Sequence, residues 1–212
     1  MGNRVRCFWI EPTDQVELSL RRYARGDEKC PTSGYGYHNA EAVLERLSIA
    51  ELAGRGWPMS EGRAVHGVDT IPKKDPRWPA KCACGYVFAE PDAWQCNPST
   101  LYRRADTGEL MLLAKAPPGA IWRAPWFEDH PAWRGPDGRT LVCRCPDGHD
   151  WIIDSHASNC TLPDDHAHKC WVRHGEPPDL TVDKNGATCA AGGGSIQTSK
   201  WHGFLRNGWL EE

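Results

Sequence analysis

Residues 143–174 read CRCPDGHDWIIDSHASNCTLPDDHAHKCWVRH, and this stretch indicates what stabilises the fold. Eleven cysteines and histidines lie between Cys143 and His202, among many turn-forming Pro, Asp and Gly residues. Thiolates and imidazoles crowded into loops are the ligands that zinc selects. The stretch therefore predicts at least one bound metal ion, with zinc as the expected cofactor.

Outside this stretch the composition is that of a globular protein with little regular helix. The chain has 212 residues, 40% of them hydrophobic, so it can bury a core as one irregular domain or as two small ones. Its 21 Gly and 17 Pro interrupt the pattern too often for long helices. We therefore predict a mainly β fold with short helical segments: an irregular, loop-rich, zinc-stapled α+β protein.

Two domains are expected. Residues 1–75 should form a β/α segment that ends in a Gly/Pro-rich linker, and residues 76–212 should form a Cys/His-rich β domain. In the first, residues 16–22 alternate apolar and polar side chains and predict a strand. Residues 40–53 predict a helix, because Asn39 could cap it and its apolar residues Val43, Leu44 and Leu47 share one face.

Three tight turns predict hairpins in the second domain. They are Asp106-Thr107-Gly108, Pro146-Asp147-Gly148 and Asn207-Gly208, each between short apolar runs. A further turn is expected at residues 183–186.

The net charge and the targeting signals indicate which classes of partner to expect. The net charge of −3 gives no general attraction to polyanions, so nucleic-acid binding is possible but not favoured without a local basic patch such as Arg103-Arg104. No apolar run is long enough to span a bilayer, so we expect no membrane association. Residues 1–10 do not resemble a secretory leader, so we expect the cysteines to stay reduced in a cytoplasm.

A first group of metal ligands is expected around Cys82-Ala83-Cys84-Gly85, followed by Cys96. A cysteine pair that ends in Gly is typical of a zinc knuckle, in which a tight turn aims both thiolates at one ion. The usual spacing has two intervening residues, whereas this pair has one. Two cysteines at a strand end without an ion are the alternative.

A second group of ligands is expected downstream. Cys145 and His149 flank the Pro-Asp-Gly turn, where a hairpin tip could hold both on one side. Further along, the set that we favour for a closed four-ligand site is Cys160, His168, Cys170 and His174, with Cys189 as the best substitute. The alternative is that some of these residues are buried thiols or surface imidazoles.

Tryptophan is unusually frequent, with 11 residues. Most should fill gaps in an irregular core, each burying on the order of 150 to 250 Å². Trp122, Trp126 and Trp133 lie in a Pro-rich segment and could instead form a stacking or protein-contact surface.

Several segments of the chain resemble a family of hypothetical proteins from tailed bacteriophages. The likeness is carried by Trp151–His174, with Asn159-Cys160 and Cys170-Trp171 inside it, by Trp201–Leu205 and by Cys7–Thr13. It covers most of the chain except roughly residues 25–74. The resemblance implies a viral origin, but the family has no established activity, so it assigns no catalytic residue.

Common catalytic motifs are missing from the sequence. It contains no His-Glu-x-x-His, no phosphate-binding Gly-rich loop and no Gly-x-Ser-x-Gly elbow. Asp165-His166-Ala167-His168 is similar to the Asp-His-x-His segment of phage HNH-type nucleases, in which a His activates water beside a catalytic metal. Paired Cys-x-x-Cys knuckles around that segment are absent.

We therefore expect a non-catalytic, metal-stabilised phage protein that acts through a surface, most plausibly a capsid- or tail-associated virion accessory protein located in the virion or the host cytoplasm. Its partners would be phage structural proteins or a host protein. Two alternatives stay open: a metal-dependent HNH-like nuclease, and a zinc-ribbon-like binder of nucleic acid or a host protein.

Overall fold

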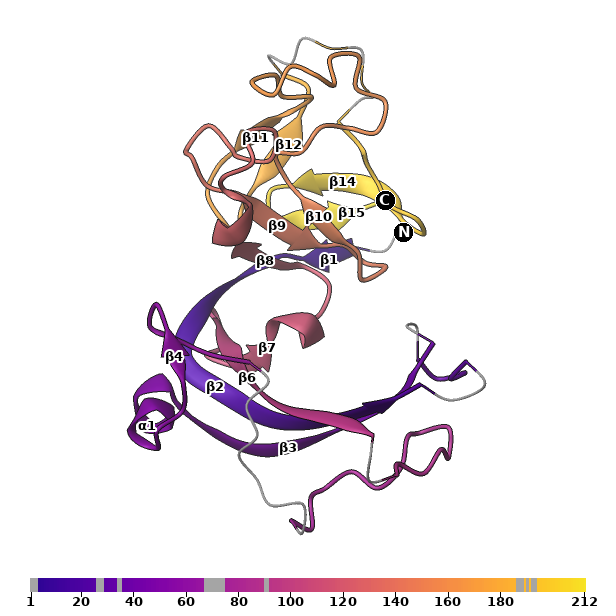
Figure 1. Cartoon of the computed structure of the whole chain (residues 1–212). Coiled ribbons are helices and arrows are strands. Elements are labelled where there is room, and N and C mark those ends of the chain that lie inside the picture. The colour runs from indigo at the N-terminus through magenta and orange to yellow at the C-terminus, as the bar shows by residue number, and fades with distance from the viewer. Residues whose placement is uncertain are drawn as a thin grey trace. The chain divides into compact units, whose positions relative to one another are not determined.

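The structure is a computed structural model that describes residues 4–25, 29–33, 36–66, 75–89, 92–185, 189, 191 and 194–212. The chain forms two compact units (Figure 1). Unit 1 consists of Met1–Glu11 and Tyr102–Glu212, and unit 2 of Pro12–Leu101. As predicted, the described residues are mainly β, with one short α-helix.

This division differs from the boundary expected near residue 75. Strands β2 (Phe8–Ala24) and β6 (Ala93–Arg104) are hydrogen-bonded neighbours. In sequence, unit 2 is an insertion within unit 1 whose two boundaries fall inside the paired strands β2 and β6, and residues 76–101 belong with the N-terminal half of the chain. A long-range strand pairing of this kind leaves no composition change at the boundary.

Unit 1 contains short strands in three groups. One sheet has the order β1-β15-β14-β13, a second joins β10, β9, β8 and the start of β2, and β11 pairs with β12. The bounds are β1 Arg4–Arg6, β7 Leu110–Leu112, β8 Ala120–Arg123, β9 Leu141–Arg144, β10 Asp150–Ile152, β11 Val172–His174, β12 Thr181–Asp183, β13 Ile196–Gln197, β14 His202–Arg206 and β15 Trp209–Glu211, with 3-10 helices η1 Leu113–Lys115 and η2 Pro125–Phe127.

The predicted hairpins of unit 1 are confirmed. β9 and β10 pair antiparallel around Pro146-Asp147-Gly148, and β14 and β15 around Asn207-Gly208. Asn207 and Gly208 both have positive φ, at 47° and 71°, which is the backbone of a tight two-residue hairpin turn. The end of β6 pairs with β7 across Asp106-Thr107-Gly108. The turn expected at residues 183–186 reaches residue 186, which lies outside the described residues.

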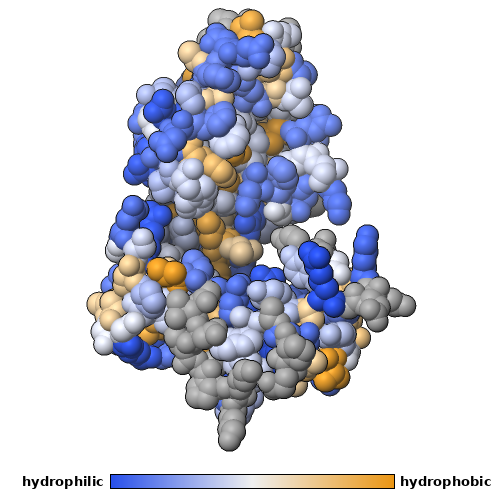
Figure 2. All heavy atoms as spheres, viewed as in Figure 1, coloured by the Kyte–Doolittle hydropathy of each residue, from blue (hydrophilic) through white to orange (hydrophobic). Residues whose placement is uncertain are grey.

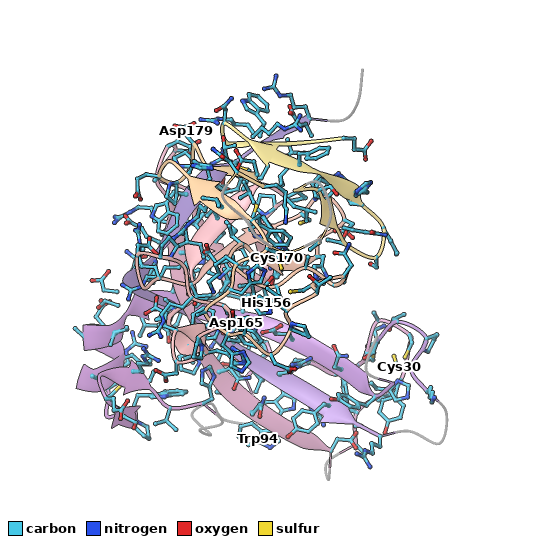
Figure 3. All side chains as sticks on the ribbon, turned by 90° about the horizontal axis from the view of Figure 1, so that it is seen from above. Cys30, Trp94, His156, Asp165, Cys170 and Asp179 are labelled. Carbon is cyan, nitrogen blue, oxygen red and sulfur yellow. The ribbon has the colours of Figure 1, made fainter. Side chains whose placement is uncertain are left out.

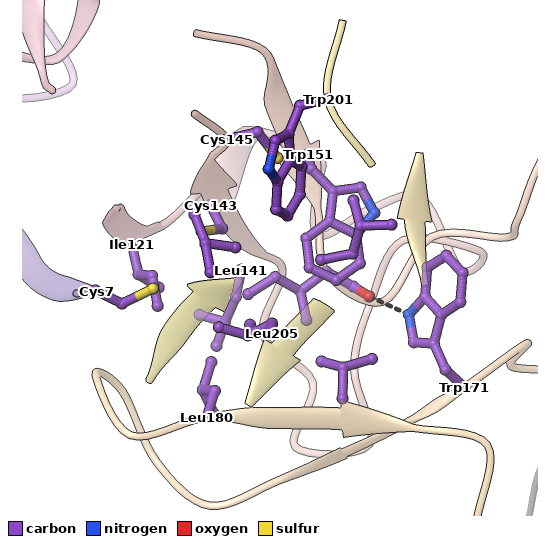
Figure 4. Packing of buried hydrophobic residues seen from close by; sticks show 14 of the residues in the cluster. Cys7, Ile121, Leu141, Cys143, Cys145, Trp151, Trp171, Leu180, Trp201 and Leu205 are labelled. Carbon is purple, nitrogen blue, oxygen red and sulfur yellow. Dashed lines mark hydrogen bonds between the residues drawn. The ribbon is translucent and has the colours of Figure 1, made fainter. Parts of the chain in front are cut away.

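Tryptophans and thiols fill the larger core of unit 1. Trp151, Trp171 and Trp201 pack with Leu141, Leu205 and Ile121 in a cluster that also buries Cys7, Cys143 and Cys145 (Figure 4). The Trp171 indole N–H donates to the Ile153 carbonyl oxygen, so this ring has a polar partner inside the core. Most tryptophans therefore have the core role expected of them.

Unit 2 is built on β2 and β3 (His38–Ser48), which pair antiparallel from Gln15↔Ser48 to Ala24↔His38. The predicted strand at residues 16–22 is confirmed as part of the longer β2. Its apolar residues Val16, Leu18 and Leu20 form a core with Leu47 and other residues of unit 2. A small hairpin of β4 (Met59–Ser60) and β5 (Arg63–Ala64) lies in the expected linker, of which residues 67–74 are outside the described part.

The helix expected over residues 40–53 is wrong for most of its length. Residues 40–48 belong to β3, and only α1 (Ile49–Gly54) is helical. Ser48 caps α1 through a capping box with Glu51, in place of the expected Asn39. Pairing with β2 overrides the local helical pattern, and Val43 of the expected apolar face is 49% exposed.

Among the described residues, no helix combines the length and apolar character needed to cross a bilayer. On the face shown in Figure 2, hydrophobic residues form small separate patches among hydrophilic ones.

Candidate metal centres

Four side chains of unit 1 converge in its loop-rich region. Cys160, His168, Cys170 and Cys189 each offer one ligand atom, and these atoms all lie within 4.8 Å of one another. We call this set the C-terminal cluster. His168 and Cys170 are buried, and the other two are half-buried. Figure 3 labels Cys170 in this region and Cys30 in the second group, described below.

The backbone around the C-terminal cluster presents donors to its sulfurs. Ala157 N donates to Cys170 Sγ and Leu162 N to Cys160 Sγ, both at 3.3 Å. Hydrogen bonds to the charged form of a group favour that form. Backbone N–H groups therefore point at two of the sulfurs, which is the kind of outer contact that orients thiolate ligands when an ion is bound.

A lysine adds positive charge to the same cluster. Lys184 Nζ donates to the carbonyl oxygens of Cys170 and Cys189 at 2.9 Å each, and lies 3.9 Å from Cys189 Sγ. Three thiolates and one neutral imidazole around a divalent ion carry a net charge of −1. The ammonium group offsets this charge next to a half-buried ligand.

The thiols of the C-terminal cluster differ in acidity. Desolvation opposes ionisation of Cys189, but hydrogen bonds from the Ala191 backbone and the His168 side chain outweigh it and lower the Cys189 pKa to about 6. Desolvation, together with the neighbouring thiols of Cys160 and Cys189, raises the pKa of Cys170 to about 12. One thiolate therefore forms readily, and a bound cation would be needed to stabilise the next.

A second group gathers in unit 2: Cys30, His38, Cys82 and Cys84, which we call the N-terminal cluster. Cys30 Sγ lies 3.7 Å from Cys82 Sγ, and His38 Nδ1 lies 3.1 Å from Cys84 Sγ. Ligand sulfurs about 2.3 Å from a tetrahedral zinc are separated by about 3.8 Å. The Cys30–Cys82 separation therefore matches two ligands of one ion.

Local backbone geometry shapes the N-terminal cluster as a knuckle. Gly85 N donates to Cys82 O at 2.9 Å, and Cys82 N to Tyr86 O at 2.8 Å, so the chain turns tightly at Cys84-Gly85. Gly85 has φ 97°, a conformation that favours glycine. His38, the first residue of β3, is buried and stacks on Tyr86 with ring centroids 4.1 Å apart.

The electrostatics of the N-terminal cluster resemble those of the other group. Desolvation opposes ionisation of Cys82, but hydrogen bonds from the backbone of Cys84 and Asn39 lower its pKa to about 6. The Thr32 hydroxyl lies 3.2 Å from Cys30 Sγ and adds a polar partner. All ten cysteines are free thiols, and so both clusters hold reduced sulfur that could bind a metal ion.

The structure brings together only part of each expected ligand set. Cys160, His168 and Cys170 are joined by Cys189, the expected substitute, while His174 lies on β11 with its Nε2 3.1 Å from Asp183 Oδ1. His174 therefore contacts Asp183 at the surface and lies outside the C-terminal cluster.

The other expected ligands lie apart from both clusters. Cys96 is fully buried in the apolar core of unit 2, next to Val16 and Leu20. Cys145 is buried in the core of unit 1, where desolvation raises its pKa to about 12, which favours the neutral thiol. His149 is exposed at the β9–β10 turn, so the hairpin tip does not present both side chains together.

Cys30 and His38 complete the N-terminal cluster but were not among the ligands expected from the sequence. Cys30 is 52 residues from Cys82, and His38 is 46 residues from Cys84. Each is an isolated residue in sequence with no nearby partner. The sequence indicated them only indirectly, because Cys82 and Cys84 supply two ligands and a closed zinc site needs four.

The three tryptophans proposed for a contact surface have different environments. Trp122 is 2% exposed and belongs to the core of unit 1. Trp126 is 52% exposed, and half-buried Trp133 stacks on His130 with ring centroids 4.0 Å apart. Phe127 contacts both Trp126 and Trp133 edge-on. Only Trp126 and Trp133 could therefore contribute to a surface.

Comparison of the chain with protein-family models, curated proteins and solved structures gave no match.

Proposed function

We propose that the protein binds two zinc ions as structural cross-links, one in each unit, and that it acts through its surface rather than by catalysis. The observation that carries this proposal is the presence of two separate groups, each with four protein ligands of the Cys3His type. Structural zinc sites are closed by four protein ligands, whereas catalytic sites keep a position open for water or substrate.

Zinc is the ion that best fits the donors. Three thiolates and one imidazole form a soft to borderline set that disfavours magnesium and calcium, which prefer oxygen. Hydrogen bonds to the sulfurs, such as those at Cys160 and Cys170, are the outer interactions that orient such ligands. The zinc content of protein purified without added metal, measured by elemental analysis and native mass spectrometry, should be two ions per chain. Metal-free protein of unchanged stability would contradict the proposal.

We further propose that the chain is a virion accessory protein of a tailed phage. The resemblance to hypothetical phage proteins supports a viral origin, and the exposed aromatic patch of Trp126, Phe127, His130 and Trp133 offers a surface for a protein partner. Mass spectrometry of purified particles tests this role. Presence at stoichiometric level supports it, and abundance only in infected cells would favour an early host-directed factor.

The nuclease alternative is less well supported by the arrangement of Asp165-His166-Ala167-His168. His168 belongs to the C-terminal cluster, and Asp165 Oδ1 accepts hydrogen bonds from the backbone N–H groups of Ala167 and His168. His166 is exposed. These residues therefore serve a loop and a metal cluster. Metal-dependent plasmid cleavage that is lost in His166→Ala would restore this alternative.

A zinc-ribbon-like binder of nucleic acid or a host protein is favoured by one observation, the Cys82–Cys84 knuckle of unit 2. Binding of single-stranded DNA that disappears with Cys82→Ser but survives Cys170→Ser would support this function.

A further inference from the structure

A hollow of about 380 Å³ lies in unit 1 beside the C-terminal cluster. Two tryptophans, Trp151 and Trp171, form part of its lining, and the polar side chains that line it include Ser158, Asn159, Ser195 and Gln197. The volume falls within the range of small-ligand sites, roughly 300 to 1,000 Å³. The virion and zinc proposals do not use this hollow.

The aromatic part of the lining is held in a fixed orientation. The rings of Trp151 and Trp171 lie 5.5 Å apart at 55° to one another, and each residue keeps 8% of its surface exposed. The indole N–H of Trp171 is bound to Ile153 O, which locks that ring (Figure 4). Rigid indole surfaces bind apolar faces of ligands with little loss of side-chain entropy.

The polar part of the lining has hydrogen-bonding groups to spare. Within the described residues, the side chains of Ser158, Asn159, Ser195 and Gln197 make no hydrogen bond to the protein. Two amides and two hydroxyls supply both donors and acceptors. They are arranged on two chain segments, one before Cys160 and one around β13.

The lining carries no Asp, Glu, Lys or Arg among the described residues. The one titratable side chain, His156, is engaged with the carbonyl oxygen of His168 at 2.9 Å. A charged ligand would lose hydration here without gaining an opposite charge. The hollow therefore selects against phosphates and carboxylates.

We infer that this hollow binds a neutral carbohydrate unit, with an apolar sugar face against Trp151 and Trp171 and its hydroxyls on Asn159, Gln197 and the two serines. A sugar ring combines an apolar face with many hydroxyls and no charge. These features complement the indole surfaces and the neutral hydrogen-bonding side chains of the lining. A nucleobase would also stack, but in a nucleotide or nucleic acid its phosphate would need a cation that the lining lacks.

The metal cluster holds both sides of this site. Asn159 directly precedes Cys160, and Trp171 directly follows Cys170. Loss of the ion should therefore release both walls together. Carbohydrate binding is nonetheless a separate property: zinc content and sugar binding are measured independently, so either proposal can fail alone.

The experiment uses the full chain as purified, with its metal content recorded. Glucose, galactose, mannose, rhamnose, N-acetylglucosamine and adenosine 5′-monophosphate are titrated individually to tens of millimolar while ligand-observed NMR and tryptophan fluorescence are followed. We expect saturable binding of at least one of the sugars and none of the charged nucleotide. No saturable response to any of the sugars, or a response to the nucleotide alone, would overturn the inference.

Variants locate the binding. Asn159→Ala and Gln197→Ala change exposed side chains, so both should fold, and each should weaken sugar binding about tenfold because a lost hydrogen bond in such a site costs about 1.4 kcal/mol. Trp126→Ala, which removes an exposed aromatic ring elsewhere in unit 1, is the matched control and should leave affinity unchanged. Unchanged affinity in both amide variants would place the sugar elsewhere and refute the site.

Discussion

The two Cys3His clusters have the same donor atoms but lie in very different kinds of structure. The C-terminal cluster lies in a region where no strand is present between the end of β10 at Ile152 and the start of β11 at Val172. The N-terminal cluster lies at the end of the β2–β3 ladder, whose last registered pair is Ala24↔His38. With an ion bound as proposed, the C-terminal cluster would order a region that has no strands, whereas the N-terminal cluster would reinforce a sheet that already exists.

This difference teaches that equal ligand sets need not contribute equally to stability. A loop without ladder hydrogen bonds depends on its metal for order, because its conformational entropy is not offset by other contacts. A strand end has backbone pairing and core contacts that persist when the ion is lost.

The largest effect should come from Cys170→Ser. Loss of this buried ligand should release one zinc and unfold residues 153–171, because structural zinc binding contributes on the order of 10 kcal/mol. Native mass spectrometry reads the metal count, and hydrogen exchange locates the loss of order. His174→Ala is the matched control: it removes a surface contact with Asp183 outside the cluster, worth at most about 1 kcal/mol, and it should keep both ions. Two ions retained in Cys170→Ser would refute this cluster.

Cys82→Ser should have a smaller effect. It should also lose one zinc, but the increase in hydrogen exchange should stay within residues 29–33 and 81–87, while the Val16–Leu20 part of β2 stays protected by its pairing with β3. Cys96→Ala, which alters a buried thiol outside the cluster, should retain both ions. Unfolding as extensive as in Cys170→Ser would remove the proposed contrast between the clusters.

Lys184→Met tests whether a nearby positive charge stabilises the C-terminal cluster alone. The variant removes the ammonium group that donates hydrogen bonds to Cys170 and Cys189, and should destabilise the protein by about 1–3 kcal/mol through the loss of these charge-assisted hydrogen bonds. Zinc release to a chelator should be faster from the C-terminal cluster alone. Equal rates in the variant and the parent protein would show that the ammonium group does not support this site.

The last effect appears only when the ion is removed, as a pH dependence of the stability of the metal-free protein. The folded pKa of Cys82 is about 6, below its ordinary value of 9.0, so its thiolate stabilises the native state above pH 9. This contribution should decline as the pH falls from about 9 to about 6, and urea unfolding at several pH values would detect it. Cys82→Ser should lose that part of the slope. A free energy of unfolding that rises on acidification through this range in the parent protein, but not in the variant, would contradict the assigned direction.

Features that depend on neighbouring residues were predicted correctly from the sequence, whereas those that depend on residues far apart in the chain were not. Asn207-Gly208 and Pro146-Asp147-Gly148 were recognised as turns because their backbone preferences are local. The expectation of a helix at residues 40–48 failed because these residues pair as β3 with β2, whose partner residues lie 18 to 33 positions earlier, from Arg22↔Ala40 to Gln15↔Ser48.

The sequence by itself determined that this protein is a loop-rich β protein with cysteine and histidine spacings typical of metal ligands, since turn formers, strand alternation and pairs such as Cys82-x-Cys84 and His168-x-Cys170 act over a few residues. Only the tertiary structure decided which residues complete each cluster. Cys189 lies beside Cys170, while His174 is held in the β11–β12 ribbon. Cys30, in the connection between the paired strands β2 and β3, lies beside Cys82. A tetrahedral site tests the positions of four side chains in space, and spacing along the chain fixes at most two of them.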